Sequence, residues 1–175
     1  MTEIIEKNRR YYPVELLQKK IKWCFVYDAN LGNFAHYSGT KDLIYLNILS
    51  VADALENGEG ANIEFFLLHE IRHMYQNLAI DKYKKEGKCL LGEEYINRWI
   101  KEKKKYLRAT DEKGNLNLNH FKQDIEKDAY AFACGVLYDK YSALPDYLFI
   151  KREKIYNQDF YNIVEGWAEC FNREC

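Results

Sequence analysis

Hydrophobic positions follow two patterns along this chain: helical spacing in most segments, and short apolar runs before residue 50. The runs at residues 23–27 and 43–49 are typical of short strands. Residues 14–22 have helical spacing and follow Pro13, a residue that is favoured near helix starts. The pattern therefore predicts a helix and a small sheet in the first part of the chain.

Helical spacing dominates the remainder, where loops rich in Gly and Asn interrupt it. Residues 56–62 predict a loop, with Asn62 as the N-cap of a helix that extends to about residue 80. The later elements are an amphipathic helix at about 93–107, a turn at 111–115, a helix from about Asn117 to Tyr141, a break at Pro145 and a helix near 157–172 with Trp167. We expect an α+β, predominantly helical fold with the sheet before the first long helix. No repeat or linker divides residues 1–175, so a single domain is expected.

The composition fits this expectation. Of 175 residues, 47% are hydrophobic, which is ample for one core, and the net charge of −1 identifies no class of partner. The N-terminus has no apolar h-region, and no apolar run approaches membrane-spanning length. A soluble, cytoplasmic protein with no membrane partner is the resulting expectation.

The cysteines form an odd set without a CxxC pair, which argues against a disulfide framework and a structural zinc knuckle. They are Cys24, Cys89, Cys134, Cys170 and Cys175. We expect free thiols, with Cys134 as a small core residue of a helix and Cys175 exposed.

Positive charge is concentrated in residues 82–108, which hold ten Lys or Arg and four Glu. The simplest interpretation is the solvated face of an amphipathic helix. A patch that attracts nucleic acid or an acidic protein is the alternative. Nucleic acid is not expected, because no motif that reads bases accompanies the charge. An acidic protein partner remains open.

The strongest chemical pattern is the HExxH motif of His69, Glu70 and His73. Residues four apart share one face of a helix, so the two imidazoles can bind one divalent ion, with Glu70 close enough to reach a water on it. A chance motif on a solvated helix is the alternative. The preceding apolar run, residues 65–68, instead predicts a buried helix, where unpartnered His and Glu side chains would be costly.

A catalytic zinc site normally has a third protein ligand. His36 and His120 have no spacing that recommends them. In the helix predicted from Asn117, Glu126 lies at the edge of the apolar stripe, whereas Asp128 points further toward solvent. Glu126 is therefore the predicted third ligand and Asp128 the reserve.

The motif His69-Glu70-x-x-His73, followed by Glu126-x-x-Ala129 with Phe132-Ala133, resembles the gluzincin peptidases. It is most similar to the compact ImmA/IrrE-type metallopeptidases of bacteria and mobile elements, in which an E-x-E-A-N-x-F-A segment follows the motif and its first Glu completes the zinc site. The resemblance covers about residues 40–140, and compact phage- or toxin-associated zincins are similar as well. This chain has Arg72 where the family usually has Gly, and Tyr130 where it has Asn or Asp. The 53 positions from His73 to Glu126 exceed the family's spacing, so the basic segment at about 82–108 is expected to be an insertion.

The resemblance implies a zinc-dependent hydrolase that cleaves peptide bonds in a protein substrate, such as a repressor of the same mobile element. One zinc ion held by His69, His73 and Glu126 would activate water, with Glu70 as general base. The oxyanion donor is left open among Tyr130, the first choice, His120 and Tyr75. Gln76 lies on the metal-facing side and is predicted either to support a ligand or to pack. An extended substrate is expected to pair with the strand at 43–49 as a sheet edge.

Two other classes of protein use similar residues. A catalytically silent zincin-fold binding or regulatory protein would often have lost Glu70 or a ligand, and all four residues are present here. A non-haem iron enzyme also uses two histidines and a carboxylate. The Glu70 carboxyl beside the ligands favours hydrolysis.

Overall fold

Helices make up most of the computed structural model, which describes residues 1–28, 34–109 and 117–142. In chain order the elements are α1 (Thr2–Lys7), the 3-10 turn η1 (Arg9–Tyr11), α2 (Val14–Leu17), β1 (Trp23–Val26), β2 (Ala35–Ser38), β3 (Leu43–Asn47), α3 (Ile48–Glu56), α4 (Gly60–Glu86), α5 (Glu93–Lys104), η2 (His120–Lys122) and α6 (Asp124–Tyr141). The fold is α+β and mostly helical, with the sheet before the long helices, as the sequence pattern predicts. No described helix is both long and apolar enough to cross a membrane.

The three strands form one sheet in the order β1-β3-β2. β1 pairs with β3 in parallel, and β2 pairs with β3 antiparallel. The pairing of the two predicted strands is therefore confirmed, whereas β2 was not predicted. Ile44 and Leu46 of β3 are fully buried on the face that packs on α4. Because β3 is central, the expectation that residues 43–49 form an exposed sheet edge is wrong; β2 is an edge strand.

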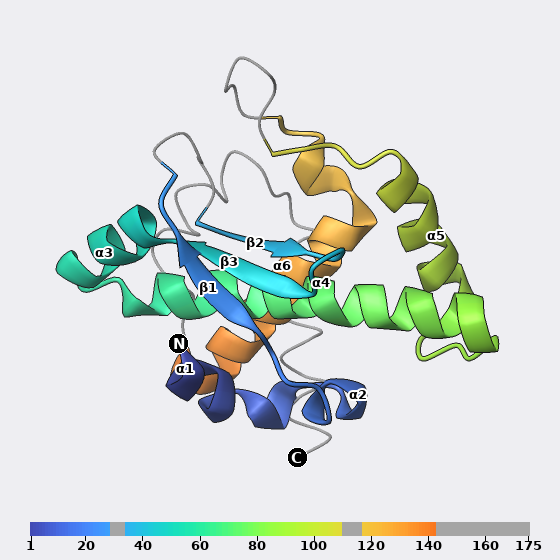
Figure 1. Ribbon diagram of the computed structural model, residues 1–175, viewed down its shortest axis with the longest axis horizontal. Helices are drawn as coiled ribbons and strands as arrows, with labels where there is room; N and C mark the ends of the chain where they lie inside the picture. The colour runs from blue at the N-terminus through green and yellow to red at the C-terminus, as the bar shows by residue number, and fades with distance from the viewer. Residues whose placement is uncertain (29–33, 110–116, 143–175) are drawn as a thin grey trace.

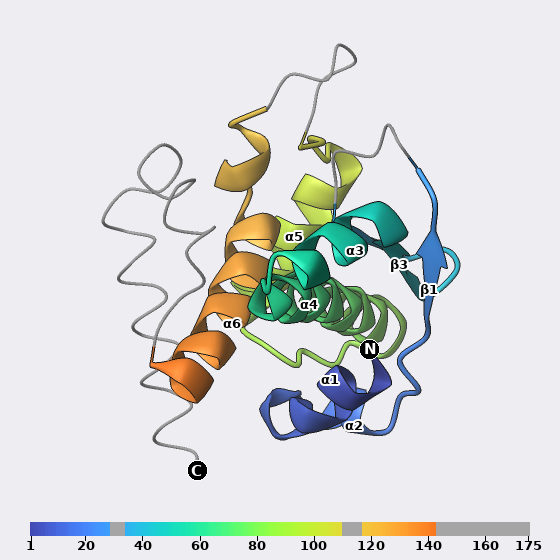
Figure 2. The same cartoon turned by 90° about the vertical axis from the view of Figure 1, so that its left-hand side faces the viewer.

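The long helix α4 lies between the sheet and α6. Figure 1 shows the sheet in front of α4, and Figure 2 shows α6 on the opposite side of that helix. Buried side chains occur all around its middle part, among them Leu67, Leu68, Ile71 and Met74. The helix is thus covered on both sides, which explains why its apolar run is continuous rather than one-sided.

The strand predicted at 43–49 ends at Asn47, because this residue begins a helix. Its side-chain oxygen accepts a hydrogen bond from the Leu49 amide at 3.2 Å, so Asn47 is the N-cap of α3. Ile48 and Leu49 are 43% and 44% exposed. Their apolar side chains predicted a strand, but Asn47 caps a helix at this point instead.

The predicted start and end of the central helix also differ. α4 begins at Gly60 with Glu59 as its N-cap, and Asn62 lies inside the first turn, where its amide donates to Glu59 Oε2 at 2.7 Å. The helix continues past residue 80 to Glu86 and ends at Gly87, whose φ of 66° favours glycine. Residues 82–86, the first of the basic segment, consequently belong to the end of α4.

Three other helices are shorter than predicted. α2 ends at Leu17 rather than at 22, α5 ends at Lys104 rather than at 107, and α6 begins at Asp124 rather than at Asn117. The start of α6 is fixed by Glu102 of α5, whose carboxylate accepts the amide hydrogens of Asp124 and Ile125, both at 2.9 Å. A contact between distant segments therefore sets this boundary, which local spacing does not reveal.

Among the described residues, Cys24, Cys89 and Cys134 form no disulfide bond, and Cys134 is 1% exposed in the core, as predicted. Cys170 and Cys175 lie outside the described residues. So do the predicted turn at 111–115, the break at Pro145 and the helix near 157–172.

Candidate metal centre

Two helices bring His69, His73 and Glu126 together. His69 Nε2 lies 3.0 Å from His73 Nε2. Glu126 Oε2 is 3.4 Å from His69 Nε2, and Glu126 Oε1 is 3.3 Å from His73 Nε2. One ligand atom from each residue lies within 4.8 Å of the others, so the group could hold a metal ion. The histidines come from α4 and the carboxylate from α6, 53 positions later in the chain.

The local sequence explains how α6 approaches α4 so closely. Ala129 and Ala133 follow Glu126 by about one and two turns, and both are fully buried. Small side chains at this spacing allow the two helix backbones to come near each other. Glu126 is fully buried as a result, and His69 is 5% exposed.

The side chains of His69, His73 and Glu126 offer one another more hydrogen-bond acceptors than donors. A carboxylate only accepts hydrogen bonds, and a neutral imidazole carries one N–H for its two nitrogens. Within the described part of the chain, Glu126 Oε2 and His69 Nδ1 have no hydrogen-bond partner. The atoms that face one another are His69 Nε2, His73 Nε2 and the Glu126 carboxylate, and burying these acceptors together is costly unless a cation lies between them. Two imidazoles and a carboxylate are the donor set of many catalytic zinc sites, so these residues fit zinc.

Gln76 sets the tautomer of His73. Its amide nitrogen donates to the Ile125 carbonyl at 2.8 Å and to Asp128 Oδ2 at 2.7 Å, so its oxygen is the atom that faces His73 Nδ1, at 2.7 Å. His73 Nδ1 must then carry the hydrogen, which leaves Nε2 of the neutral ring free to bind a metal. Of the two predicted roles of Gln76, the structure therefore favours support of a ligand.

Asp128, the reserve ligand, is engaged elsewhere. Arg72 donates to it from Nε at 2.8 Å and from Nη2 at 2.9 Å. Arg72 stands where the family that the motifs resemble usually has a glycine. Its pair with Asp128 joins α4 to α6 beside the metal ligands. Asp128 does not point freely to solvent, since its side chain is 16% exposed.

The pKa values of His73 and Glu126 depend on each other. Burial would lower the pKa of His73, but the Glu126 carboxylate, with smaller contributions from Glu70 and Gln76, raises that pKa to about 9. Burial would likewise raise the pKa of Glu126, but His73, His120 and His69 hold it well below its usual value. In the absence of a metal, the positive charge that the site requires is therefore supplied by a proton on His73.

Zinc affinity should consequently rise with pH. Zinc must displace the His73 proton, so below a pKa of about 9 the affinity should fall about tenfold for each unit by which the pH is lowered. The metal-free fold has the opposite dependence: the raised pKa stabilises it below the ordinary value of 6.5, and this stabilisation is lost as the pH rises through about 9. Competition titrations with a chromophoric chelator between about pH 6 and about pH 8 would measure the slope. An affinity that is constant over this range contradicts the proton displacement.

Glu70 lies beside the ligands and is held by the sheet. It is 6% exposed, and its Oε2 accepts a hydrogen bond from the backbone amide of Tyr37 in β2 at 2.6 Å. The strand thus presents a donor to the carboxylate that the sequence analysis selects as general base. This contact was not predicted, because nothing in residues 35–38 marked a strand.

The three candidate oxyanion donors have different surroundings. The Tyr130 ring packs against His69, with ring centroids 4.2 Å apart. His120 Nε2 is 3.3 Å from Glu126 Oε2, although spacing in the sequence did not recommend this histidine. Tyr75 is 3% exposed within the main core, with the Arg72 guanidinium 4.9 Å from its ring centre. Tyr130 and His120 therefore adjoin the ligands, while Tyr75 contributes to the core.

Tyr106 is a site residue that the sequence analysis missed. Its hydroxyl donates to Glu126 Oε1 at 2.7 Å. Burial and the neighbouring Glu126 raise the pKa of Tyr106 well above its usual value, so the hydroxyl keeps its proton. No motif or fixed spacing links residue 106 to residue 126, and a tyrosine beside the Lys-rich helix gave no separate indication.

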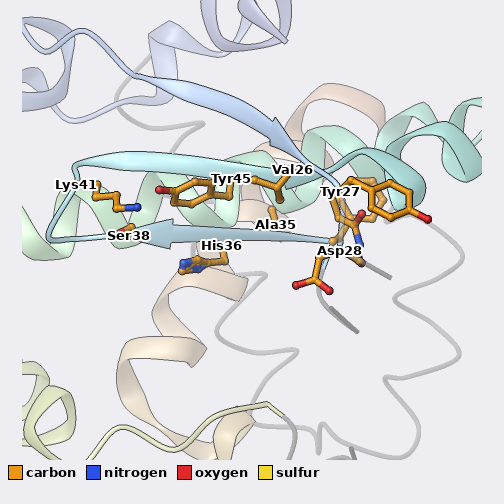
Figure 3. Close-up of a pocket in the computed structure, with 10 residues that line it drawn as sticks. Val26, Tyr27, Asp28, Ala35, His36, Ser38, Lys41 and Tyr45 are labelled. Carbon is orange, nitrogen blue, oxygen red and sulfur yellow. Dashed lines mark hydrogen bonds between the residues drawn. The ribbon is translucent and has the colours of Figure 1, made fainter. Parts of the chain in front are cut away.

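A cavity of about 400 Å³ lies along the outer face of the sheet. Figure 3 shows His36 and Ser38 of β2 and Tyr45 of β3 among its lining residues. The His36 and Tyr45 rings face each other with centroids 5.4 Å apart. None of the three metal-binding candidates is among the described residues that line this cavity, so His36 belongs to a different surface from the candidate metal centre.

Comparison of the chain with protein families, with curated proteins and with solved structures finds no match.

Proposed function

We propose that this chain is a zinc-dependent metallopeptidase of the gluzincin type, resembling the ImmA/IrrE-type enzymes. The observation that carries the proposal is the convergence of His69, His73 and Glu126 in a buried site with Glu70 beside them. Ligands alone would fit a structural metal site. A buried carboxylate that adjoins the ligands without belonging to them supplies the group that hydrolysis requires.

Each residue of the site has a separate role in the proposed reaction. A zinc ion held by His69, His73 and Glu126 would supply a water of lowered pKa and polarise the substrate carbonyl. Glu70 takes the proton of the attacking water and delivers it to the leaving amine. The Tyr37 amide holds the Glu70 carboxylate in place, because it donates a hydrogen bond to one of its oxygens. Tyr130 and His120, which adjoin the ligands, are the candidates for stabilising the negative charge on the carbonyl oxygen.

The position of β2 supports an extended protein substrate. The Phe34 carbonyl accepts from Asn47 of β3 at 3.0 Å, whereas the Tyr37 amide points away from β3 to Glu70. The outer edge of β2 therefore adjoins the general base. A substrate segment that adds to this edge as a further strand would place its peptide bond near Glu70. By resemblance, the substrate is a regulatory or repressor protein, and the basic residues of 82–108 would attract an acidic one.

Hydrolysis of a mixed peptide library by the zinc-loaded protein tests this function. Cleavage products should appear, should disappear when a zinc chelator is added, and should return when zinc is restored. A preparation of Glu70→Gln, purified in the same way, controls for contaminating peptidases. A zinc-loaded protein that cleaves neither the library nor unfolded proteins would contradict the proposal.

A further inference from the structure

The segment between α5 and α6 contacts both oxygens of Glu126. The Tyr106 hydroxyl donates to Oε1 at 2.7 Å, and His120 Nε2 lies 3.3 Å from Oε2. The two rings meet edge to face, with centroids 5.8 Å apart. Tyr106 belongs to the segment 82–108, which was expected to be a basic insertion with a solvated face, yet it contacts the carboxylate of the candidate metal centre.

Several hydrogen bonds hold the backbone next to Tyr106 in place. Gln123 accepts from the Leu107 amide at 3.0 Å and donates to the Leu107 carbonyl at 3.1 Å. His120 Nδ1 lies 2.9 Å from the same carbonyl. Since Leu107 directly follows Tyr106, these contacts hold the backbone that carries the tyrosine.

The same segment is tied to the helix that provides Glu126. The Glu102 carboxylate, in the last turn of α5, accepts the amide hydrogens of Asp124 and Ile125 at the start of α6. A carboxylate at a helix N-terminus also interacts favourably with the helix dipole. The end of α5, Tyr106 and the first turn of α6 are thus joined around Glu126.

We propose that Tyr106, which closely follows the basic helix α5, is a positioning residue for the metal ligand Glu126 and thereby belongs to the metal centre. Tyr106 holds Oε1 by a hydrogen bond, while Oε2 has only the longer contacts to His120 Nε2 at 3.3 Å and His69 Nε2 at 3.4 Å and is left for the metal. Carboxylate ligands are commonly oriented by such a hydrogen bond, whose loss weakens metal binding. The inference rests on the metal site of the proposed function, but it does not require that the protein cleave peptides.

The Tyr106→Phe variant tests it, because the change removes only the hydroxyl. Zinc affinity, measured by competition with a chromophoric chelator, should fall about tenfold to hundredfold. The thermal midpoint of the metal-free protein should remain close to that of the wild type, which distinguishes positioning of the ligand from a general loss of structure. Tyr138→Phe is the matched control, since Tyr106 and Tyr138 are both 46% exposed and Tyr138 lies on α6 with Glu126. Its zinc affinity should not change.

A double-variant comparison shows whether the effect passes through Glu126. In a Glu126→Ala background, Tyr106→Phe should no longer change the residual zinc affinity. Wild-type zinc affinity that is retained in Tyr106→Phe would overturn the inference and leave the proposed function in place. A wild-type protein without zinc affinity would overturn both.

Discussion

Replacement of Glu126 by alanine is expected to lower the zinc affinity by more than about a hundredfold. Loss of a group that merely orients a ligand costs about tenfold to hundredfold, and the loss of a ligand itself should exceed this range. Glu126 is also the fully buried anion around which His69, His73 and His120 are gathered. Its removal should therefore leave two imidazoles without the charge that draws a divalent ion between them. Zinc affinity by chelator competition, with circular dichroism to confirm folding, measures the effect.

Asp128→Asn is the control for this prediction. Asp128 lies half a turn further along α6, and it was the reserve ligand in the sequence analysis. Since Arg72 occupies both of its oxygens and Asp128 reaches His73 only through Gln76, the amide variant should lose much less zinc affinity than Glu126→Ala. Loss of zinc in Asp128→Asn together with retention in Glu126→Ala would reverse the assignment of the third ligand.

Replacement of Glu70 by glutamine is expected to lower the hydrolysis rate by about a hundredfold to ten-thousandfold. Glutamine has nearly the shape of glutamate, and its carbonyl oxygen can still accept the hydrogen bond from the Tyr37 amide. The variant loses only the capacity to take a proton from water. Its rate of peptide cleavage, at saturating zinc, measures this loss.

Zinc affinity separates the two roles of the HExxH motif. Because Glu70 is not a ligand in the proposed site, Glu70→Gln should bind zinc about as tightly as the wild type. If the variant cleaves peptides at the wild-type rate, Glu70 is not the general base. If it keeps the protein's full biological effect without any cleavage, a zincin-fold binding protein becomes the better account.

The local parts of the site were predictable from the sequence. His69, Glu70 and His73 follow from the geometry of one helix, and Glu126 follows from its place at the edge of an apolar stripe. The close approach of α4 and α6 followed from the small residues Ala129 and Ala133. In each case the relevant spacing lies within one helix, so it can be read without knowing the fold.

The remaining contacts depend on tertiary structure. Tyr106 and His120 reach Glu126 because Glu102 binds the start of α6 and Gln123 binds Leu107, and no sequence spacing encodes these contacts. β2 is four residues long and contains His36 and Ser38, so it lacks the apolar run that identified the other two strands. The helix α3 was not predicted, because its cap at Asn47 outweighs the strand propensity of the residues that follow it.

X-ray absorption at the zinc edge, on the wild-type protein loaded with one equivalent of zinc, tests directly whether His69, His73 and Glu126 bind the ion. We expect the zinc ion to have nitrogen and oxygen neighbours at about 2.0–2.2 Å, including two imidazoles, and no sulfur neighbour. The histidine contribution should decrease by one in a His73→Ala sample that has been given the same zinc. A sulfur neighbour at about 2.3 Å would place the ion on cysteine instead, and a protein that retains no zinc at neutral pH would contradict the metal centre itself.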